Sequence, residues 1–246
     1  MKRTVNTIII SSIFFIVALS YICSEKPQGK KQVKINNQTQ ADGKDYWQEP
    51  SKTTWLAKLD STKFSNTKKT LKNYYIIFDG SGSMKGEKIH IAKKALKQFI
   101  KSVPKEANVG LAVFDTKGNF ERAPLGSTKE KIIAAIDKVV AAGHTPLGET
   151  TEIAYKKLEK QARKQLGYGE YNLVIITDGH ATDKDKLNES INIILNDSPI
   201  TVHTIGFQIG KDHILNQKGK IFYTQANNFK ELSTSLKKVL AESVKF

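Results

Sequence analysis

The chain has 246 residues, 39% of them hydrophobic and 26% charged, which is enough apolar material for one large domain or two small ones. Its formal net charge is +15 at pH 7, from 39 Lys and Arg against 24 Asp and Glu. The single cysteine, Cys23, excludes an intramolecular disulfide and a zinc site built from several thiolates.

The basic excess does not by itself indicate nucleic acid as a partner. Residues 73–246 carry 26 Lys and Arg against 19 Asp and Glu, and the lysines are scattered among the acids. The sequence has neither an arginine-rich patch nor interleaved aromatic and basic residues. We therefore expect a solvated basic surface and no nucleic-acid partner. Polyanion binding through the lysine-rich segment before residue 73 stays open as an alternative.

The first segment, residues 1–24, is interpreted as an export signal or a membrane anchor. Two basic residues precede an uncharged, apolar stretch from Thr4 to Ser24. Three fates stay open: cleavage after Ser20, lipid attachment at Cys23, or retention as a single membrane span, which needs about 20 apolar residues. Each fate places the rest of the chain outside the cytoplasm, at the cell envelope.

Residues 25–72 are rich in Lys, Gln, Asn, Thr and Asp and lack sustained hydrophobic periodicity. This composition predicts a polar, lysine-rich tether. The two tryptophans, Trp47 and Trp55, fall within it. We expect them to pack a short element onto the domain that follows.

From residue 73 onward, strand-like and helix-like segments alternate. The expected strands are 74–78, 109–114, 119–123, 172–177, 201–207 and 220–224, and the expected helices are 85–102, 128–140, 147–165, 183–196 and 229–239. Such alternation predicts an α/β fold, in which a doubly wound, mostly parallel sheet carries helices on both faces. The segment 73–246 is therefore expected to form one domain.

Two helix starts carry specific expectations. Ser127 or Thr128 is expected to cap the second helix, whose inward face includes Val139 and Val140. Asp183 and Asp185 are expected to cap the helix that begins near residue 183.

Polar residues follow two of the buried strands at the point where each strand ends. Asp79, Ser81 and Ser83 come directly after YYIIF, and Asp178 follows NLVIIT. Thr145 precedes a proline in the turn GHTPLGET. Open parallel sheets bind ligands at the carboxyl ends of their strands, so these side chains are expected to lie near one another.

These residues supply hard oxygen donors. Two carboxylates and three hydroxyls suit Mg²⁺, which demands oxygen ligands at roughly 2.0 to 2.1 Å and commonly keeps several waters. Gly80 and Gly82 are expected to give the backbone the tight path that brings the serines together.

The segments DGSGS at 79–83, TPLGE at 145–149 and IITDG at 175–179 together resemble the von Willebrand factor type A domain in order and spacing. The resemblance implies a Rossmann-like fold with a metal-ion-dependent adhesion site. It also implies that Ser81 and Ser83 bind Mg²⁺ or Mn²⁺ directly.

For the remaining site residues, the resemblance implies that Thr145 joins the ligands when a partner is bound, and that Asp79 and Asp178 act largely through water. His144 departs from the family pattern, because bacterial members often carry glycine at this place. This difference is expected to affect access to the metal more than metal binding.

The functional hypothesis is a non-enzymatic, metal-dependent protein-binding module of the bacterial envelope, for adhesion or complex assembly. The metal would bridge to an Asp or Glu carboxylate of a partner protein, and the N-terminal segment would contact the membrane. The alternative is a Mg²⁺-dependent phosphoryl hydrolase with Asp79 as nucleophile. Such enzymes generally carry a second acid two residues later, where this chain has Ser81.

Other candidates carry less weight. His90, His180, His203 and His213 fall in different expected elements without paired ligand spacing, and are interpreted as ordinary polar or partly buried residues. Glu149 is interpreted as a first-turn charge at a helix N-terminus.

Overall fold

The structure is a computed structural model that describes residues 71–242. The predicted export signal or anchor, both tryptophans and nearly all of the predicted tether lie outside the described residues. Among residues 71–242, no helix is both long enough and apolar enough to cross a membrane.

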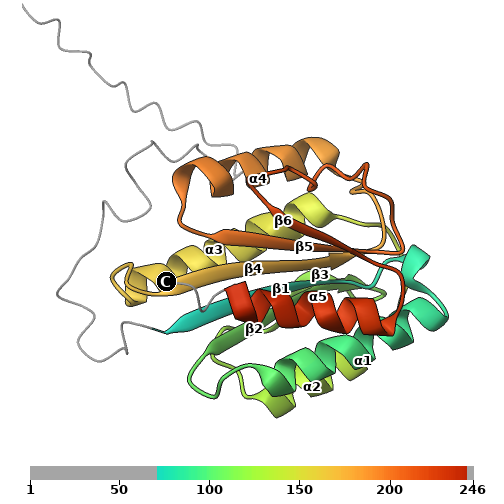
Figure 1. Ribbon diagram of the computed structural model, residues 1–246, viewed down its shortest axis with the longest axis horizontal. Coiled ribbons are helices and arrows are strands. Elements are labelled where there is room, and N and C mark those ends of the chain that lie inside the picture. The colour runs from blue at the N-terminus through green and yellow to red at the C-terminus, as the bar shows by residue number, and fades with distance from the viewer. Residues whose placement is uncertain (1–70, 243–246) are drawn as a thin grey trace, which may run out of the picture. The chain divides into compact units, whose positions relative to one another are not determined.

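Six strands form one sheet in the order β3-β2-β1-β4-β5-β6 (Figure 1). The strands are β1 (Lys72–Asp79), β2 (Asn108–Asp115), β3 (Gly118–Ala123), β4 (Glu170–Thr177), β5 (Thr201–Phe207) and β6 (Phe222–Ala226). Every pairing is parallel except β2 with β3, which is antiparallel. The predicted α/β class with a mostly parallel sheet is confirmed.

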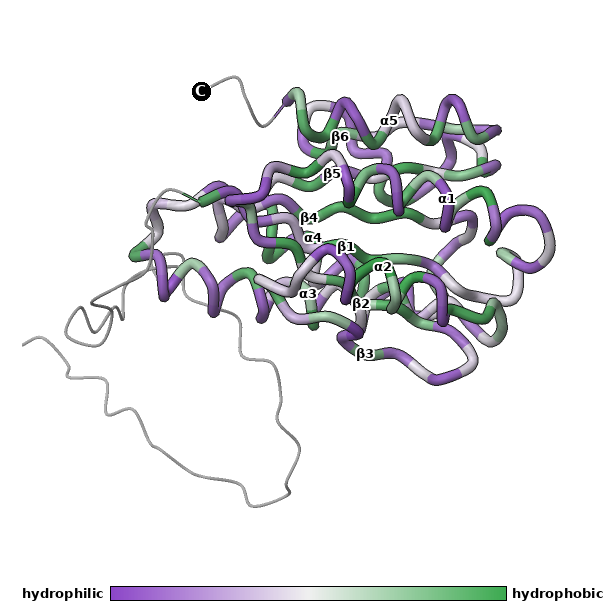
Figure 2. The backbone as a smooth tube through the Cα atoms, turned by 90° about the horizontal axis from the view of Figure 1, so that it is seen from below, coloured by the Kyte–Doolittle hydropathy of each residue, from purple (hydrophilic) through white to green (hydrophobic). Residues whose placement is uncertain are grey.

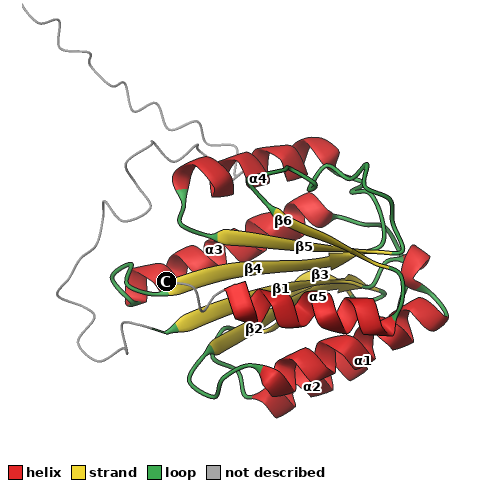
Figure 3. Ribbon diagram, in the orientation of Figure 1, coloured by secondary structure: helices red, strands yellow, loops and turns green. Residues whose placement is uncertain are grey.

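Helices cover both faces of this sheet (Figure 3). α1 (Glu87–Ser102), α2 (Lys129–Asp137) and α5 (Phe229–Glu242) pack on one face, and α3 (Leu147–Lys164) and α4 (Lys184–Asp197) pack on the other. A short 3₁₀ helix, η2 (Gly82–Met84), separates β1 from α1.

The central strands are apolar on both sides because both sides are covered. In β1, Tyr74, Ile76 and Phe78 face the core beneath α1, α2 and α5, whereas Tyr75 and Ile77 face the core beneath α3 and α4. Figure 2 shows the central strands in the green of hydrophobic residues. The continuous apolar runs in the sequence are therefore buried strands whose two faces lie against two different cores.

Several boundaries differ from the sequence prediction by a few residues, among them those of β1 and β6. β1 already begins at Lys72, a residue assigned to the tether, and β6 spans Phe222–Ala226 in place of 220–224. These shifts follow from pairing: Lys72 lies opposite Glu170 of β4, and Ala226 lies opposite Phe207 of β5. A neighbouring strand therefore extends each segment beyond its apolar run.

The predicted extent of the second helix was wrong at its C-terminal end. α2 starts after Thr128, whose hydroxyl accepts the N–H of Lys131, but it ends at Asp137. Val140 is 56% exposed and outside the helix. Its backbone N–H donates to the Asp115 carboxylate, at 3.2 Å, and this tertiary hydrogen bond draws the chain toward the end of β2.

A candidate metal site at the carboxyl edge of the sheet

The sheet changes direction of winding at β1, which lies between β2 and β4. Loops that leave neighbouring strands at such a switch point diverge and leave room for a ligand. Because Phe78 lies opposite Ile176 in the parallel register, the acids that follow these two strands are brought to the same edge. The loops after β1 and β4 therefore form the floor of the candidate site.

Asp79 is the buried anchor of this floor, with 0% of its surface exposed. Its Oδ1 accepts the backbone N–H of Ser81 at 2.8 Å, and its Oδ2 accepts the hydroxyl of Thr177 at 2.6 Å. Burial raises the pKa of Asp79, these hydrogen bonds lower it, and the neighbouring Asp178 raises it further. The net direction is upward, because burial outweighs the donors.

The two serines and Asp178 form a hydrogen-bonded chain above this floor. The hydroxyl oxygens of Ser81 and Ser83 are 3.0 Å apart. The Ser83 hydroxyl donates to Oδ1 of Asp178 at 2.6 Å, and the Asp178 side chain is fully buried. Both hydroxyl oxygens thus lie between the two acids.

Thr145 approaches the same place from the loop before α3. A Cβ placed on Gly179 would lie 3.6 Å from the Ser83 hydroxyl oxygen and 3.8 Å from the Thr145 hydroxyl oxygen. Both hydroxyls therefore face one small space beside Gly179, which the missing side chain leaves open. The structure thus brings together all five of the residues singled out from the sequence.

Backbone hydrogen bonds hold the three loops in this arrangement. Gly82 donates to Gly143 at 3.0 Å, and Ala142 donates to Gly80 at 2.9 Å, joining the first loop to the second. Thr182 donates to the carbonyl of Thr145 at 2.9 Å, joining the third. Since backbone groups make these bonds, the positions of the hydroxyls are set by the loop paths.

Of the two glycines expected to permit the tight path, Gly80 is the one under steric constraint. A Cβ at Gly80 would lie 2.8 Å from the Phe114 carbonyl oxygen and 2.9 Å from Cγ1 of Val139. A Cβ at Gly82 would meet nothing closer than 3.4 Å. The close approach of the first loop to β2 is therefore what demands glycine.

Two residues of the site were missed by sequence reasoning. Thr177 holds Asp79 from a position 98 residues away in the chain. Lys88, in the first turn of α1, donates to Oδ2 of Asp178 at 2.7 Å. The hydroxyl at the end of an otherwise apolar strand was a usable signal for Thr177. Lys88 had no signal, because it is one lysine among many.

Two of the histidines interpreted as ordinary polar or partly buried residues lie beside the third loop of the site. His180 and His213 stack with ring centroids 5.3 Å apart. Nδ1 of His213 accepts the N–H of Leu215, so the proton is on Nε2, which donates to the carbonyl of Gly179 at 3.0 Å. Burial lowers the pKa of His213, which favours this neutral ring. His213 thus holds the Gly179 loop through its carbonyl.

Asp183 caps a different helix from the one expected. It is the residue before α4, but its side chain makes no capping hydrogen bond there. Its carboxylate instead accepts the N–H groups of Gly148 and Glu149, at 3.0 and 2.8 Å, in the first turn of α3. The close packing of α3 on α4 places these donors within reach, a tertiary effect that local sequence does not reveal.

Within the described part of the chain, no group of three or more His, Cys, Asp or Glu residues is placed to hold a metal ion. A cation at this edge would therefore depend on hydroxyl oxygens for much of its shell.

The sequence is similar to that of the uncharacterized protein YwmD of Bacillus subtilis (strain 168), with 32% identity over 143 residues. The match covers 50% of this chain and 62% of YwmD, so the chain spans less than two thirds of that relative.

Solved structures show the same fold at low sequence identity. The pilus adhesin SpaC of Lactobacillus rhamnosus GG superposes with a TM-score of 0.60 and 16% identity, over 72% of this chain and 31% of that one. The manganese-loaded TRAP protein of Plasmodium vivax superposes with a TM-score of 0.54 and 20% identity, over 69% of this chain and 73% of that one.

The family model of the von Willebrand factor type A domain matches residues 73–239, which include β1 from its second residue and most of α5. This match spans more than half of the chain and all three loops of the candidate site. The chain therefore belongs to the von Willebrand factor type A domain family.

Proposed function

We propose that this protein is a metal-dependent protein-binding module, for adhesion or complex assembly, at the bacterial cell envelope. The observation that carries the proposal is the 3.0 Å separation of the Ser81 and Ser83 hydroxyl oxygens. Adjacent ligands of an octahedral ion with bonds of 2.0 to 2.1 Å are separated by about 2.9 Å. The two hydroxyls are thus already spaced as neighbouring ligands of Mg²⁺.

The residues present fit a hard dication. Ser81, Ser83 and Thr145 would supply neutral oxygens, and Asp79 and Asp178 would balance the charge. The Ser83 hydroxyl donates its proton to Asp178, which leaves the lone pairs of that oxygen available to a cation. Mn²⁺ has similar ligand preferences, and the related fold of TRAP was solved loaded with manganese.

A dication held mainly by neutral oxygens remains a strong Lewis acid toward an anionic ligand. An Asp or Glu carboxylate of a partner protein suits that role. The SpaC fold neighbour is a pilus adhesin, which supports a binding role of this kind. The envelope location and a membrane contact rest on the apolar N-terminal stretch of the sequence.

The surroundings of Asp79 support a binding role over phosphoryl hydrolysis. A carboxylate nucleophile needs an oxygen free to attack phosphorus in line. In Asp79 one oxygen accepts a backbone N–H and the other accepts a hydroxyl, and the side chain is fully buried.

The test is calorimetric titration of the full-length chain with Mg²⁺ and Mn²⁺, beside partner capture from envelope extract. Ser81→Ala with Ser83→Ala should abolish metal binding while circular dichroism shows an intact fold. The matched control is Ser127→Ala with Ser233→Ala, which removes two hydroxyls that have no hydrogen-bond partner. Partner capture should vanish with EDTA and return with Mg²⁺.

Other results would favour the other functions. Turnover of a generic phosphatase substrate, lost in Asp79→Asn, would favour the hydrolase. Capture that persists in EDTA but falls steeply with salt would favour polyanion binding through the lysine-rich segment.

A further inference from the structure

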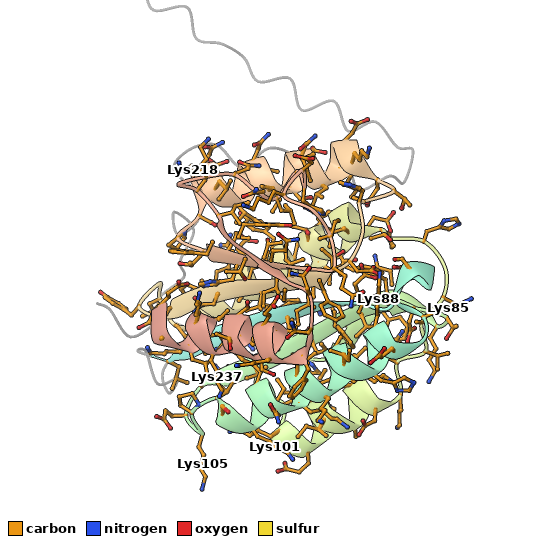
Figure 4. All side chains as sticks on the ribbon, turned by 45° about the vertical axis from the view of Figure 1, so that its right-hand side comes forward. Lys85, Lys88, Lys101, Lys105, Lys218 and Lys237 are labelled. Atoms are coloured by element: carbon orange, nitrogen blue, oxygen red, sulfur yellow. The ribbon has the colours of Figure 1, made fainter. Side chains whose placement is uncertain are left out.

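An ammonium group already occupies one side of the candidate site. Nζ of Lys88 lies 2.7 Å from Oδ2 of Asp178, and the Asp178 side chain is 0% exposed while that of Lys88 is 29% exposed. Figure 4 labels Lys88 together with Lys85, which lies on the turn before α1 and is exposed. Lys88 is therefore built into the site and Lys85 is not.

This lysine changes the charge that a metal meets. A bound dication favours the ionised form of both acids, so Asp79 and Asp178 would then contribute two negative charges, of which Lys88 balances one. With a dication bound, the group would carry a net charge of +1, whereas without Lys88 it would be neutral. A carboxylate arriving on the metal would make the natural site neutral but would leave a site without Lys88 negative.

We propose that Lys88 is a resident counter-cation that couples metal binding to ligand binding. Its positive charge lowers the affinity of the empty site for the metal. The same charge raises the affinity of the metal-loaded site for an anionic ligand. Since such coupling is reciprocal, an acidic ligand also tightens the metal. This inference rests on the proposed function and adds to it a reason why metal and partner would bind together.

Calorimetric titration of the full-length chain with Mg²⁺ tests the first half. Lys88→Met should tighten the Mg²⁺ Kd by about tenfold, because even in water a dication and a unit charge several ångströms apart interact this strongly. Lys88→Arg keeps the positive charge, so it should tighten Mg²⁺ binding less than Lys88→Met does. Lys85→Met removes the same charge from the neighbouring turn and should change little, because solvent screens it.

Acetate serves as the probe carboxylate for the second half. At constant ionic strength, replacing chloride with acetate should tighten the Mg²⁺ Kd of the natural chain. The ratio of the Mg²⁺ Kd in chloride to that in acetate should be smaller in Lys88→Met, because the metal-loaded site of that variant carries no net positive charge. An equal ratio in both proteins would overturn the coupling.

If Lys88 has only a structural role, the Mg²⁺ affinity of Lys88→Met should change in the opposite direction. If the lysine only positions Asp178, Lys88→Met should weaken Mg²⁺ binding, and a weaker or unchanged Kd in a folded variant would overturn the proposal. Should Lys88→Met unfold without metal, saturating Mg²⁺ must restore its fold, since the dication then replaces the ammonium. A variant that stays unfolded in Mg²⁺ also overturns it.

The two proposals fail in different ways. If the natural chain, Lys88→Met and Lys88→Arg all bind neither Mg²⁺ nor Mn²⁺, the proposed function is wrong and this inference falls with it. If the natural chain binds metal through its serines but Lys88→Met does not bind more tightly, only the role of Lys88 is wrong.

Discussion

The hydroxyl of Thr177 donates a 2.6 Å hydrogen bond to Oδ2 of Asp79, and so joins the ends of the two central strands, β4 and β1. A buried carboxylate without such a donor would carry an uncompensated desolvation cost. The Thr177 hydroxyl therefore joins two strands of the sheet and also favours the ionised form of Asp79.

Replacing this hydroxyl should destabilise the domain. We expect Thr177→Val to lower the free energy of unfolding by about 1 to 3 kcal/mol, since a buried acceptor loses its donor. The measurement is urea denaturation monitored by circular dichroism. Thr204→Val is the matched control, because the Thr204 hydroxyl is buried on the adjacent strand β5 without a hydrogen-bond partner and its removal should cost little. Equal costs would contradict this role for Thr177.

A methyl group at Gly80 should disturb the site and the fold together. The added Cβ would press on the carbonyl oxygen of Phe114, which is backbone and cannot rotate away. We expect Gly80→Ala to cost about 1 to 3 kcal/mol of unfolding free energy. Gly210→Ala is the control: its Cβ would meet nothing within 4 Å, so it should be neutral or stabilising by up to about 1 kcal/mol. A neutral Gly80→Ala would show that the loop can shift.

The two acids near the start of α4 should differ in their effects. Asp183→Ala should cost about 1 kcal/mol, because its carboxylate caps the first turn of α3. Asp185→Ala removes an exposed charge from the first turn of α4 and should cost only a few tenths of a kcal/mol. Denaturant titration of both variants checks the order. A larger loss in Asp185→Ala would contradict the capping assignment.

Acid should weaken the domain through His203. Burial lowers the pKa of this imidazole to about 4, and its ring stacks on Phe222 with centroids 5.1 Å apart. The carboxylate of Glu242, 3.4 Å from Nδ1, favours the protonated ring, but we expect burial to outweigh it because His203 is only 2% exposed.

The direction of the pH effect follows from the lowered pKa. Between pH 6.5 and 4 the unfolded chain binds a proton at this histidine and the folded chain does not. The neutral ring therefore favours the folded state above pH 6.5, and about 3 kcal/mol is lost as the pH falls to 4. NMR titration of the ring measures the pKa directly, and His203→Gln should flatten this part of the stability profile. A measured pKa above 6.5 would show that the Glu242 pairing dominates.

Much of the architecture follows from local patterns. The apolar runs around Ile76 and Ile175 predict buried strands, and the helical periodicity between them predicts the crossovers of a parallel sheet. The carboxyl ends of parallel strands share an edge, so Asp79 and Asp178 could be placed together before any contact was known. The cap at Thr128 was predictable for the same reason, since its partner lies three residues away.

Other features depended on partners remote in the chain. Lys88 contacts an acid 90 residues away, and Asp183 caps a helix that begins 36 residues before it. The end of α2 is set by Asp115 through the N–H of Val140, and His213 reaches back to the carbonyl of Gly179. None of these pairs has a sequence spacing that distinguishes it from chance.

The amino-acid sequence alone determined the layered sheet and which oxygen-bearing residues stand at its binding edge, because hydrophobic periodicity and strand direction are local properties. Only the tertiary structure decided which donors and charges satisfy those oxygens, Thr177 for one acid and Lys88 for the other. A buried carboxylate takes whichever partner the packing of distant segments brings within about 3 Å, and that choice is a property of the folded chain as a whole.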